Sequence, residues 1–447
     1  MKATRDEVVA SLDRLEAQAV TFLRPVLELP PPSFGLAYHG LNDRIINERI
    51  ARFFRNTVPD LTTEAKHCTV KQTRGAGDRL RLGVCSMFLR YHTIGHFTRG
   101  LIARFPRSEF EVIAIRPDTK PDPIAAEIAE TCDRLVTISH GFRAARQTIA
   151  ELKLDVLFYP DIGMNQLTYL LAHSRLAPVQ CVTWGHPDTT GLDTLDYFLS
   201  AKDLETEQDA DDQYTETLIR LNELPTYYYR PTEPADANRC DFGLPESGNL
   251  YLCPHTLYKF HPDFDEIMGG ILRADETGHV VLVNSHEHAT SELQTRLKSV
   301  IPDVADRVIF VERVPNPNFL EFLSLADVVL DTLHFGCGRM VFEGTAVGAP
   351  TVTLPGQFMR ARVVYAVYKR MGITECIVGD QASYIDTAVR LATDRGWRDE
   401  IVGRIRERSH LVFERAEAVE EMAAFFKQAV HAADRGEKID HVKTDHA

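Results

Sequence analysis

The stretch DVVLDTLHFGCGRMVFEGTAVGAPTVTLP, residues 327–355, contains a complete strand–turn–helix–strand pattern. A short apolar run at 328–330 ends at Asp331, and two glycines follow in a tight turn. A helical segment then leads to a second strand-like run at 350–355. Buried strands joined through a helix form the βαβ unit of a parallel sheet, so this stretch predicts an α/β fold.

The same alternation extends in both directions along the chain. Strand-like runs recur from residue 79 onward with amphipathic segments between them, interrupted only by a polar, Pro-containing stretch at 226–240. We therefore expect two Rossmann-like domains, 79–232 and 233–412, facing a cleft, with ligands outside the carboxyl ends of the strands. A helical N-terminal region (1–78), with helical stretches at 6–27 and 41–54, and a C-terminal helix and tail (413–447) complete the predicted organisation.

The composition is that of a globular protein with an acidic balance. Hydrophobic residues make up 44% of the 447 residues, and the formal net charge is −14. That balance argues against a nucleic-acid partner, which requires a basic face. The N-terminus has no apolar signal-peptide core, and no stretch approaches the roughly 18 apolar residues of a membrane span. We expect a cytoplasmic protein, and the eight scattered cysteines predict no zinc site.

Two segments of the second domain predict a diphosphate site. Gly336 and Gly338 precede a helix that starts near Arg339, and a helix N-terminus attracts anions. Glu343 lies in the first turns of that helix, where it is placed to accept hydrogen bonds from a ribose. Lys259, in PHTLYKFHPDF, follows another strand and would neutralise a diphosphate leaving group. A plain strand–turn–helix junction and a solvated lysine are the structural alternatives.

Two segments of the first domain carry polar residues at carboxyl strand ends. SMFLRYHTIGHF holds His92 and His96, four residues apart and therefore on one face if both are helical. Histidine is suited to general-base work near neutral pH. The loops YPDIGM and GHPDTTG offer further donors and acceptors for a base or for sugar hydroxyls: Asp161, His186, Asp188, Thr189 and Thr190. Packing, capping and turn formation are the structural alternatives for these residues.

The four segments, in this order, resemble the O-GlcNAc transferase and SPINDLY-like glycosyltransferases, including the bacterial protein N-glucosyltransferases. The resemblance covers about residues 80–412 and rests on LRLGVCSMFLRYHTIGH, RLAPVQCVTWGHPDTTG, LYKFHP and LADVVLDTLHFGCGRMVFEGTAVGAPTVTLPG. It implies a GT-B fold, a UDP-sugar donor, no metal or other cofactor, inversion at the anomeric carbon and a protein or peptide acceptor.

The resemblance also implies roles for individual residues. Lys259 matches the family's diphosphate-binding lysine, Glu343 stands where the family has a ribose-binding aspartate, and His92 matches an active-site histidine. Gly338, Arg339 and Met340 occupy the place of a His-Thr-Thr run that contacts the diphosphate. A second active-site histidine of the family corresponds to Asp155. The last two differences leave the donor sugar and the acceptor atom open.

The resemblance thus implies an inverting, metal-independent transferase that moves a sugar from UDP-hexose or UDP-GlcNAc to a protein side chain. Two other functions fit the same motifs: a two-domain UDP-sugar epimerase and a non-catalytic sugar-nucleotide- or protein-binding module. An NAD-dependent dehydrogenase is disfavoured because no GxGxxG follows the first strand. The oligomeric state is left open by these patterns.

Overall fold

The computed structural model describes residues 2–18, 20–29, 34–70, 75, 77–284, 286–315 and 318–439. The chain forms two compact units. Unit 1 comprises Met1–Ala37, Leu41–Tyr228 and Arg415–Ala447, and unit 2 comprises Tyr38–Gly40 and Tyr229–Glu414. The N-terminal helices and the C-terminal helix thus pack with unit 1.

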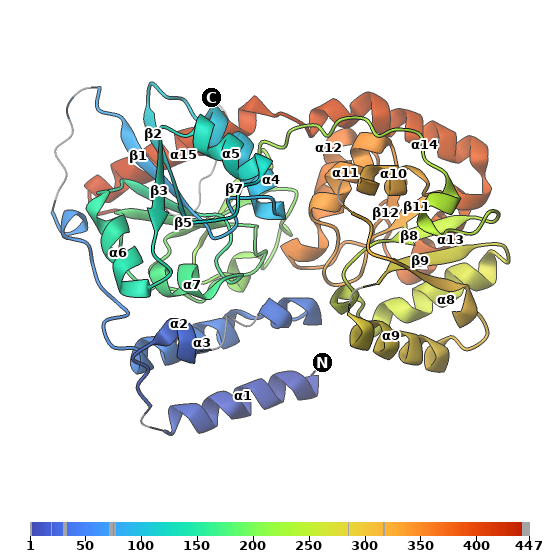
Figure 1. The fold of residues 1–447 in the computed structure, drawn as a ribbon, viewed down its shortest axis with the longest axis horizontal. Coiled ribbons are helices and arrows are strands. Elements are labelled where there is room, and N and C mark those ends of the chain that lie inside the picture. The colour runs from blue at the N-terminus through green and yellow to red at the C-terminus, as the bar shows by residue number, and fades with distance from the viewer. Residues whose placement is uncertain are drawn as a thin grey trace. The chain divides into compact units, whose positions relative to one another are not determined.

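Unit 1, whose strands are drawn in blue to green in Figure 1, is built on a seven-stranded parallel sheet in the order β3-β2-β1-β4-β5-β6-β7. Its central strands are buried along their whole length, which explains why they appear in the sequence as continuous apolar runs. The strands are β1 (Leu80–Cys85), β2 (Phe110–Pro117), β3 (Arg134–Ile138), β4 (Val156–Tyr159), β5 (Val179–Thr183), β6 (Tyr197–Ala201) and β7 (Thr217–Leu221). The sequence has strand-like runs at the positions of all these strands except β7.

The helices of unit 1 follow the expected alternation with the strands. They are α1 (Lys2–Glu16), α2 (Pro25–Glu28), α3 (Arg44–Thr57), α4 (Thr93–Arg104), α5 (Pro123–Thr131), α6 (Phe142–Glu151), α7 (Gln166–Ala172) and α15 (Ala416–Asp434). The expected helical stretch at 6–27 is interrupted after Glu16. Pro25 begins a separate helix, because proline is tolerated in a first turn and not in a helix interior.

Unit 2 is built on a five-stranded parallel sheet in the order β10-β9-β8-β11-β12. The strands are β8 (Leu250–Cys253), β9 (His279–Val283), β10 (Val308–Val311), β11 (Val328–Leu330) and β12 (Thr351–Val352). The helices are α8 (Asp265–Ala274), α9 (Glu287–Val300), α10 (Phe319–Ser324), α11 (Arg339–Val347), α12 (Val363–Met371), α13 (Gln381–Thr393) and α14 (Arg395–Arg408).

The strand order reverses at one point in each sheet. β1 lies between β2 and β4, and β8 lies between β9 and β11. At such a point the loops after the two central strands diverge and leave a crevice at the carboxyl edge, where ligands bind. The segments after β1 and β4, and those after β8 and β11, are therefore the places where each unit is suited to hold a ligand.

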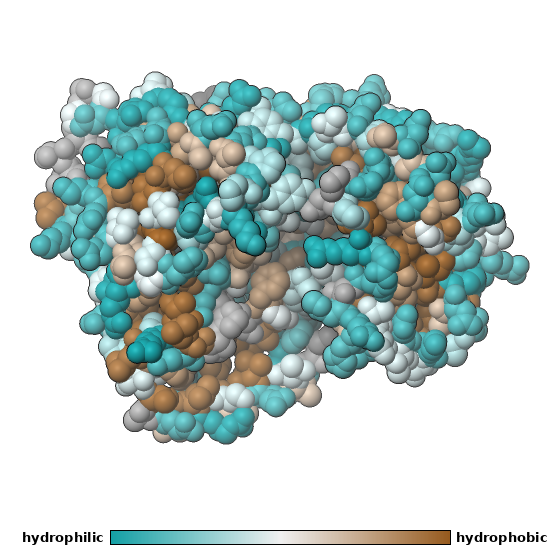
Figure 2. All heavy atoms as spheres, viewed as in Figure 1, coloured by the Kyte–Doolittle hydropathy of each residue, from teal (hydrophilic) through white to brown (hydrophobic). Residues whose placement is uncertain are grey.

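The surface carries no sign of a membrane span among the described residues. No helix there combines the length and the hydropathy that crossing a bilayer requires. On the face drawn in Figure 2, apolar patches are interrupted by hydrophilic side chains.

The C-terminal helix α15 contributes to the core of unit 1. The Phe426 ring is fully buried and packs 5.8 Å from the ring centroids of both Phe105 and Phe158. Phe426→Ala should therefore lower the free energy of unfolding of unit 1 by about 3–5 kcal/mol, which denaturant titration measures. Gln428 is exposed two residues away, so Gln428→Ala should leave the free energy of unfolding nearly unchanged. Equal effects of the two changes would contradict this packing role.

Candidate active site

A buried carboxylate shapes the glycine turn of unit 2. Asp331 follows β11, and its carboxylate accepts hydrogen bonds from the Cys337 N–H at 2.6 Å and the Thr353 hydroxyl at 2.7 Å. The Tyr384 hydroxyl donates to the Asp331 carbonyl at 3.0 Å. A side chain at Gly336 would collide with the Asp331 carboxylate, so the turn requires glycine there.

Lys259 lies against the same turn, although 77 residues separate it from Gly336. Its Nζ donates to the Gly336 carbonyl at 2.6 Å and stands 4.5 Å from the centroid of the Phe335 ring. Burial lowers the pKa of Lys259, while the neighbouring Cys337 and Asp331 oppose that shift. The two segments predicted to form a diphosphate site are thus brought together.

The backbone N–H groups of the turn are already hydrogen-bonded within unit 2. The Gly336 N–H donates to the Arg360 carbonyl at 2.8 Å, and the Cys337 N–H is bonded to Asp331. Any backbone donors for an anion must therefore come from Gly338 onward, at the start of α11. Met340 lies in this first turn and is 9% exposed. Gly336 shapes the turn and presents its carbonyl to Lys259.

Glu343 is paired with Arg339 one helical turn away. The Arg339 guanidinium lies 2.9 Å from the Glu343 carboxylate, and both side chains are largely buried. Burial raises the pKa of Glu343, and the Arg339 charge opposes that shift. Glu343 therefore orients Arg339, so a ribose at this position would have to share the carboxylate with it.

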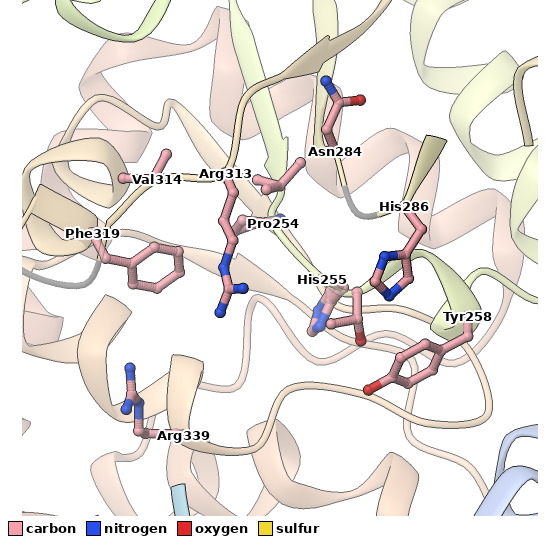
Figure 3. Close-up of a pocket in the computed structure, with 11 residues that line it drawn as sticks. Pro254, His255, Tyr258, Asn284, His286, Arg313, Val314, Phe319 and Arg339 are labelled. Atoms are coloured by element: carbon pink, nitrogen blue, oxygen red, sulfur yellow. The ribbon is translucent and has the colours of Figure 1, made fainter. Parts of the chain in front are cut away.

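A pocket of about 380 Å³ opens at the carboxyl edge of the unit 2 sheet. Its lining comes from the segments that follow four neighbouring strands, β10, β9, β8 and β11. The side chains of Arg313 and Arg339 extend into it, beside the Phe319 ring (Figure 3). The other lining residues are Pro254, His255, Thr256, Tyr258, Val283, Asn284, His286 and Val314. One apolar wall and two guanidinium groups suit a ligand with a flat ring and an anionic tail.

His255, Asp331 and Cys337 are close enough to suggest a metal site, but they form part of the scaffold. The three offer ligand atoms within 4.8 Å of one another and are all buried. Cys337 Sγ contacts His255 Nε2 at 3.4 Å, and burial raises the pKa of the Cys337 thiol. The ammonium of Lys259 lies close to the same groups, and a like charge disfavours a cation.

Asp161 lies at the carboxyl edge of unit 1, after β4. The Ser86 hydroxyl, after the neighbouring strand β1, hydrogen-bonds to its carboxylate. The residue is 1% exposed, and burial raises the pKa of Asp161 from 3.8 to about 7. Gly185, after β5, packs against it so closely that a Cβ there would lie 3.0 Å from Asp161 Cβ. A carboxyl group with such a pKa is suited to accept a proton near neutral pH.

His92 caps α4 rather than belonging to it. Its Nδ1 accepts the Ile94 N–H at 3.2 Å, and its ring stacks on Phe88 at 4.3 Å. The helix begins at Thr93, so His92 is not helical and the condition for a shared helical face with His96 is not met. Because Nδ1 accepts this bond, a neutral His92 carries its proton on Nε2 and acts there as a donor.

His96 lies within α4, four residues after the capping residue His92. Its ring meets Tyr91 edge-on at 5.2 Å and stacks on Tyr228 at 6.4 Å.

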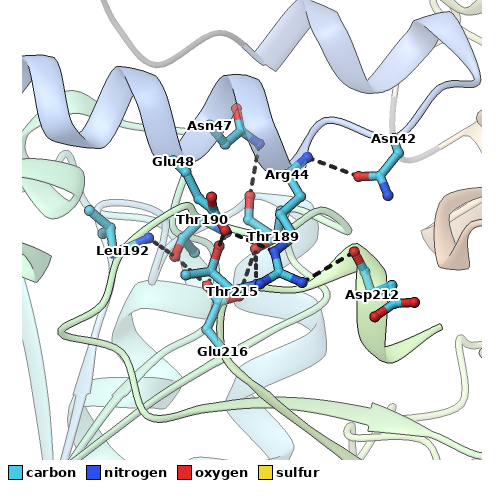
Figure 4. A network of polar contacts seen from close by, with 10 residues as sticks. All are labelled: Asn42, Arg44, Asn47, Glu48, Thr189, Thr190, Leu192, Asp212, Thr215 and Glu216. Atoms are coloured by element: carbon cyan, nitrogen blue, oxygen red, sulfur yellow. Dashed lines mark hydrogen bonds and ion pairs between the residues drawn. The ribbon is translucent and has the colours of Figure 1, made fainter. Parts of the chain in front are cut away.

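The loop that carries Thr189 and Thr190 is held by a buried carboxylate (Figure 4). Glu216 accepts the Thr189 hydroxyl at 2.7 Å, the Thr190 N–H at 3.0 Å and the Thr190 hydroxyl. Both threonines are at most 4% exposed. Their hydroxyls thus maintain the loop, and we do not assign them to a sugar.

His186 and Asp188 lie in the same loop. The His186 ring packs on Phe34 at 4.7 Å and borders a small cavity with Asn47 and Tyr169. The Asp188 carboxylate accepts the Thr189 N–H at 2.9 Å, and the side chain is buried. Asp155, which the resemblance aligns with a family histidine, accepts the Arg81 N–H at the amino ends of β1 and β4, away from the carboxyl edge.

The raised pKa of Asp161 should appear in the pH dependence of stability. Between about pH 4 and pH 7 the folded protein retains a proton that the unfolded chain has released, so this group makes unfolding easier as the pH rises. Asp161→Asn should therefore raise the free energy of unfolding at pH 8 by a few kcal/mol, because each unit of pKa shift corresponds to about 1.4 kcal/mol. Below pH 4 the same substitution should change the free energy of unfolding little. Denaturant titrations across this range test it.

The exposed change Asp386→Asn should follow the wild type at every pH. An Asp161→Asn effect that is the same at pH 4 and pH 8 would contradict the raised pKa.

Comparison with known proteins gives a consistent result. Residues 222–420 match the model of glycosyl transferase family 41. The chain is 26% identical over 275 residues to the UDP-glucose:protein N-beta-glucosyltransferase of Actinobacillus pleuropneumoniae serotype 5b (strain L20), covering 59% of this chain and 43% of the relative. It is 27% identical over 344 residues to the probable UDP-N-acetylglucosamine–peptide N-acetylglucosaminyltransferase SPINDLY of Petunia hybrida. This match covers 71% of this chain and 34% of the relative. The matched region is thus less than half of each relative.

Solved structures show the same fold. A mutant of the Thermobaculum terrenum O-GlcNAc transferase aligns with a TM-score of 0.79 at 22% identity, covering 96% of this chain and 82% of that one. The Anabaena protein HepE in complex with UDP and glucose aligns with a TM-score of 0.51 at 10% identity. This alignment covers 78% of this chain and 100% of that one. The expected GT-B type of fold, with two Rossmann-like domains, is confirmed. The expected resemblance to the O-GlcNAc transferase and SPINDLY-like glycosyltransferases is confirmed as well, with the family 41 match covering residues 222–420.

Proposed function

We propose that the protein is an inverting glycosyltransferase that moves a sugar from a UDP-sugar to a protein side chain without a metal ion. The observation that carries the proposal is the position of Lys259 Nζ, 2.6 Å from the Gly336 carbonyl at the turn before α11. Both segments lie inside the region that matches the family model. The named activities of the protein N-glucosyltransferase and SPINDLY relatives support UDP-glucose and UDP-GlcNAc as the donors to test first.

Unit 2 would bind the donor in the pocket described above. The apolar wall formed by Val314 and Phe319 accepts the base, and the guanidinium groups of Arg313 and Arg339 attract the diphosphate. Lys259 would exchange the Gly336 carbonyl for a phosphate oxygen, and the new negative charge would favour its protonated form. Together with the start of α11, these cations stabilise the departing UDP, the task that a divalent ion performs in other transferases.

Unit 1 would act on the acceptor. The acceptor nucleophile attacks the anomeric carbon while the bond from that carbon to the β-phosphate oxygen breaks, which inverts the configuration. Asp161 takes the proton that the acceptor loses, because its pKa of about 7 matches neutral conditions. His92, protonated on Nε2, donates a hydrogen bond that orients a substrate oxygen.

Lys259 is the sharpest test of the donor site. Lys259→Ala should reduce kcat on a peptide library by at least about 100-fold, since one lost transition-state donor costs about 3 kcal/mol. UDP affinity, measured by calorimetry, should fall as well. Lys298→Ala, on the exposed side of α9, is the matched control and should leave both unchanged. Turnover within twofold of wild type would exclude this role for Lys259.

The same assays separate the other functions. Conversion of a UDP-sugar to its epimer without any acceptor would indicate an epimerase. Tight UDP-sugar binding with no product on any acceptor peptide would indicate a binding module.

The pH profile tests the base. Activity should rise with pH through about 7 as Asp161 loses its proton, and Asp161→Asn should remove this limb and lower kcat by roughly 10²–10⁴-fold. If the activity of Asp161→Asn still rises with pH through about 7, the group that titrates is not Asp161.

A further inference from the structure

Two histidines and an aspartate gather on the surface of unit 2, outside the pocket lining. His261, Asp263 and His334 offer ligand atoms that all lie within 4.8 Å of one another. We propose that these three side chains form a binding site for a divalent transition-metal ion of the Zn²⁺ class. The proposal does not depend on the function proposed above.

The carboxylate of Asp263 lies between the two imidazoles. His334 Nε2 is 2.9 Å from Asp263 Oδ2, and His261 Nδ1 is 3.4 Å from Asp263 Oδ1. The rings meet edge to face with centroids 4.5 Å apart. One nitrogen from each ring and one carboxylate oxygen are therefore close enough together to be ligands of a single ion, with further positions left for water.

The backbone holds these side chains in place. His261 caps the short helix Pro262–Phe264, where its Nδ1 accepts the Asp263 N–H at 3.2 Å, a long hydrogen bond that an ion would replace. His334 has φ +65°, a left-handed conformation that is uncommon for a residue with a side chain. Gly40 lies against its ring so closely that a Cβ there would be 2.6 Å from His334 Cγ. Strain of this kind is retained where the surroundings or a function require it.

The chemistry selects the class of ion. Two imidazole nitrogens with one carboxylate suit Zn²⁺ and its neighbours, whereas Mg²⁺ and Ca²⁺ require oxygen ligands. Asp263 and His334 are 51% and 32% exposed, so an ion and completing waters have access from solvent. The nearby cation Arg296 is already neutralised by the Asp265 carboxylate, with hydrogen bonds of 2.8 and 2.9 Å.

The site would join the two segments of the pocket region. His261 follows Lys259 by two residues, and His334 precedes Gly336 by two. A bound ion would therefore fix the segment after β8 to the loop after β11. None of the three proposed ligands lines the pocket in which the donor is proposed to bind.

Zinc binding to the full chain tests the proposal. Protein stripped with EDTA and then dialysed should take up one Zn²⁺ per chain in calorimetry. His334→Asn, which keeps a residue tolerant of the left-handed conformation, and Asp263→Asn should each weaken binding by at least about tenfold, since even the outer partners of metal ligands are worth 10–100-fold. His288→Ala, an exposed histidine that pairs with Glu292 on α9, is the control and should bind as the wild type does.

Cobalt distinguishes this site from the buried cluster that contains Cys337. Co²⁺ bound to two histidines and a carboxylate gives weak visible bands without a sulfur-to-cobalt charge-transfer band. The proposal is overturned by the absence of stoichiometric Zn²⁺ uptake, by unchanged affinity in folded His334→Asn and Asp263→Asn, or by a thiolate band that disappears in Cys337→Ser. Circular dichroism confirms that each variant is folded.

Discussion

The buried carboxylate of Asp331 is the constraint on which the donor side of the molecule depends. It closes the turn by accepting the Cys337 N–H and fixes that turn to β12 through Thr353. A carboxylate in this position leaves no room for a side chain at residue 336, and the backbone carbonyl of the glycine found there accepts the hydrogen bond from Lys259. The turn that leads into α11 and contacts the lysine is thus held by this one group.

Strand and helix patterns in the sequence were sufficient to predict most of the fold. Buried parallel strands such as Val156–Tyr159 are apolar on both faces and are easily recognised. Strand β7 was missed because Thr217–Leu221 mixes threonine and arginine with leucine and directly follows a long acidic run. An edge strand buries one side less completely, so its sequence carries a weaker signal.

Site residues were predictable where the chemistry is local to a loop, and less so where it depends on a distant partner. Lys259 and the glycine turn were named from their places after strands, but their contact links residues 77 apart. The hydroxyls of Thr189 and Thr190 looked available because their partner Glu216 lies 26 or 27 residues further along the chain.

The pocket contains residues that sequence reasoning set aside or missed. His286 and Arg313 line the pocket but lie outside the four motifs, although Arg313 follows a strand just as the glycine turn does. The Arg339–Glu343 pair could have been read from its spacing of four residues on one helix.

The contact of α3 with the loop that carries His186 has a consequence for dividing this chain into fragments. Asn47 donates to the Thr189 carbonyl at 2.9 Å, and the backbone of α3 lies directly against Gly191, whose φ is +74°. A fragment that begins at residue 79 would therefore lose the contacts of α3 with the loop that Glu216 holds. Water would reach that carboxylate and favour its charged form, and the loop would lose its support. The helices before β1 are thus part of the first Rossmann-like unit. Proteolysis or truncation between these helices and β1 would remove side chains that pack inside that unit.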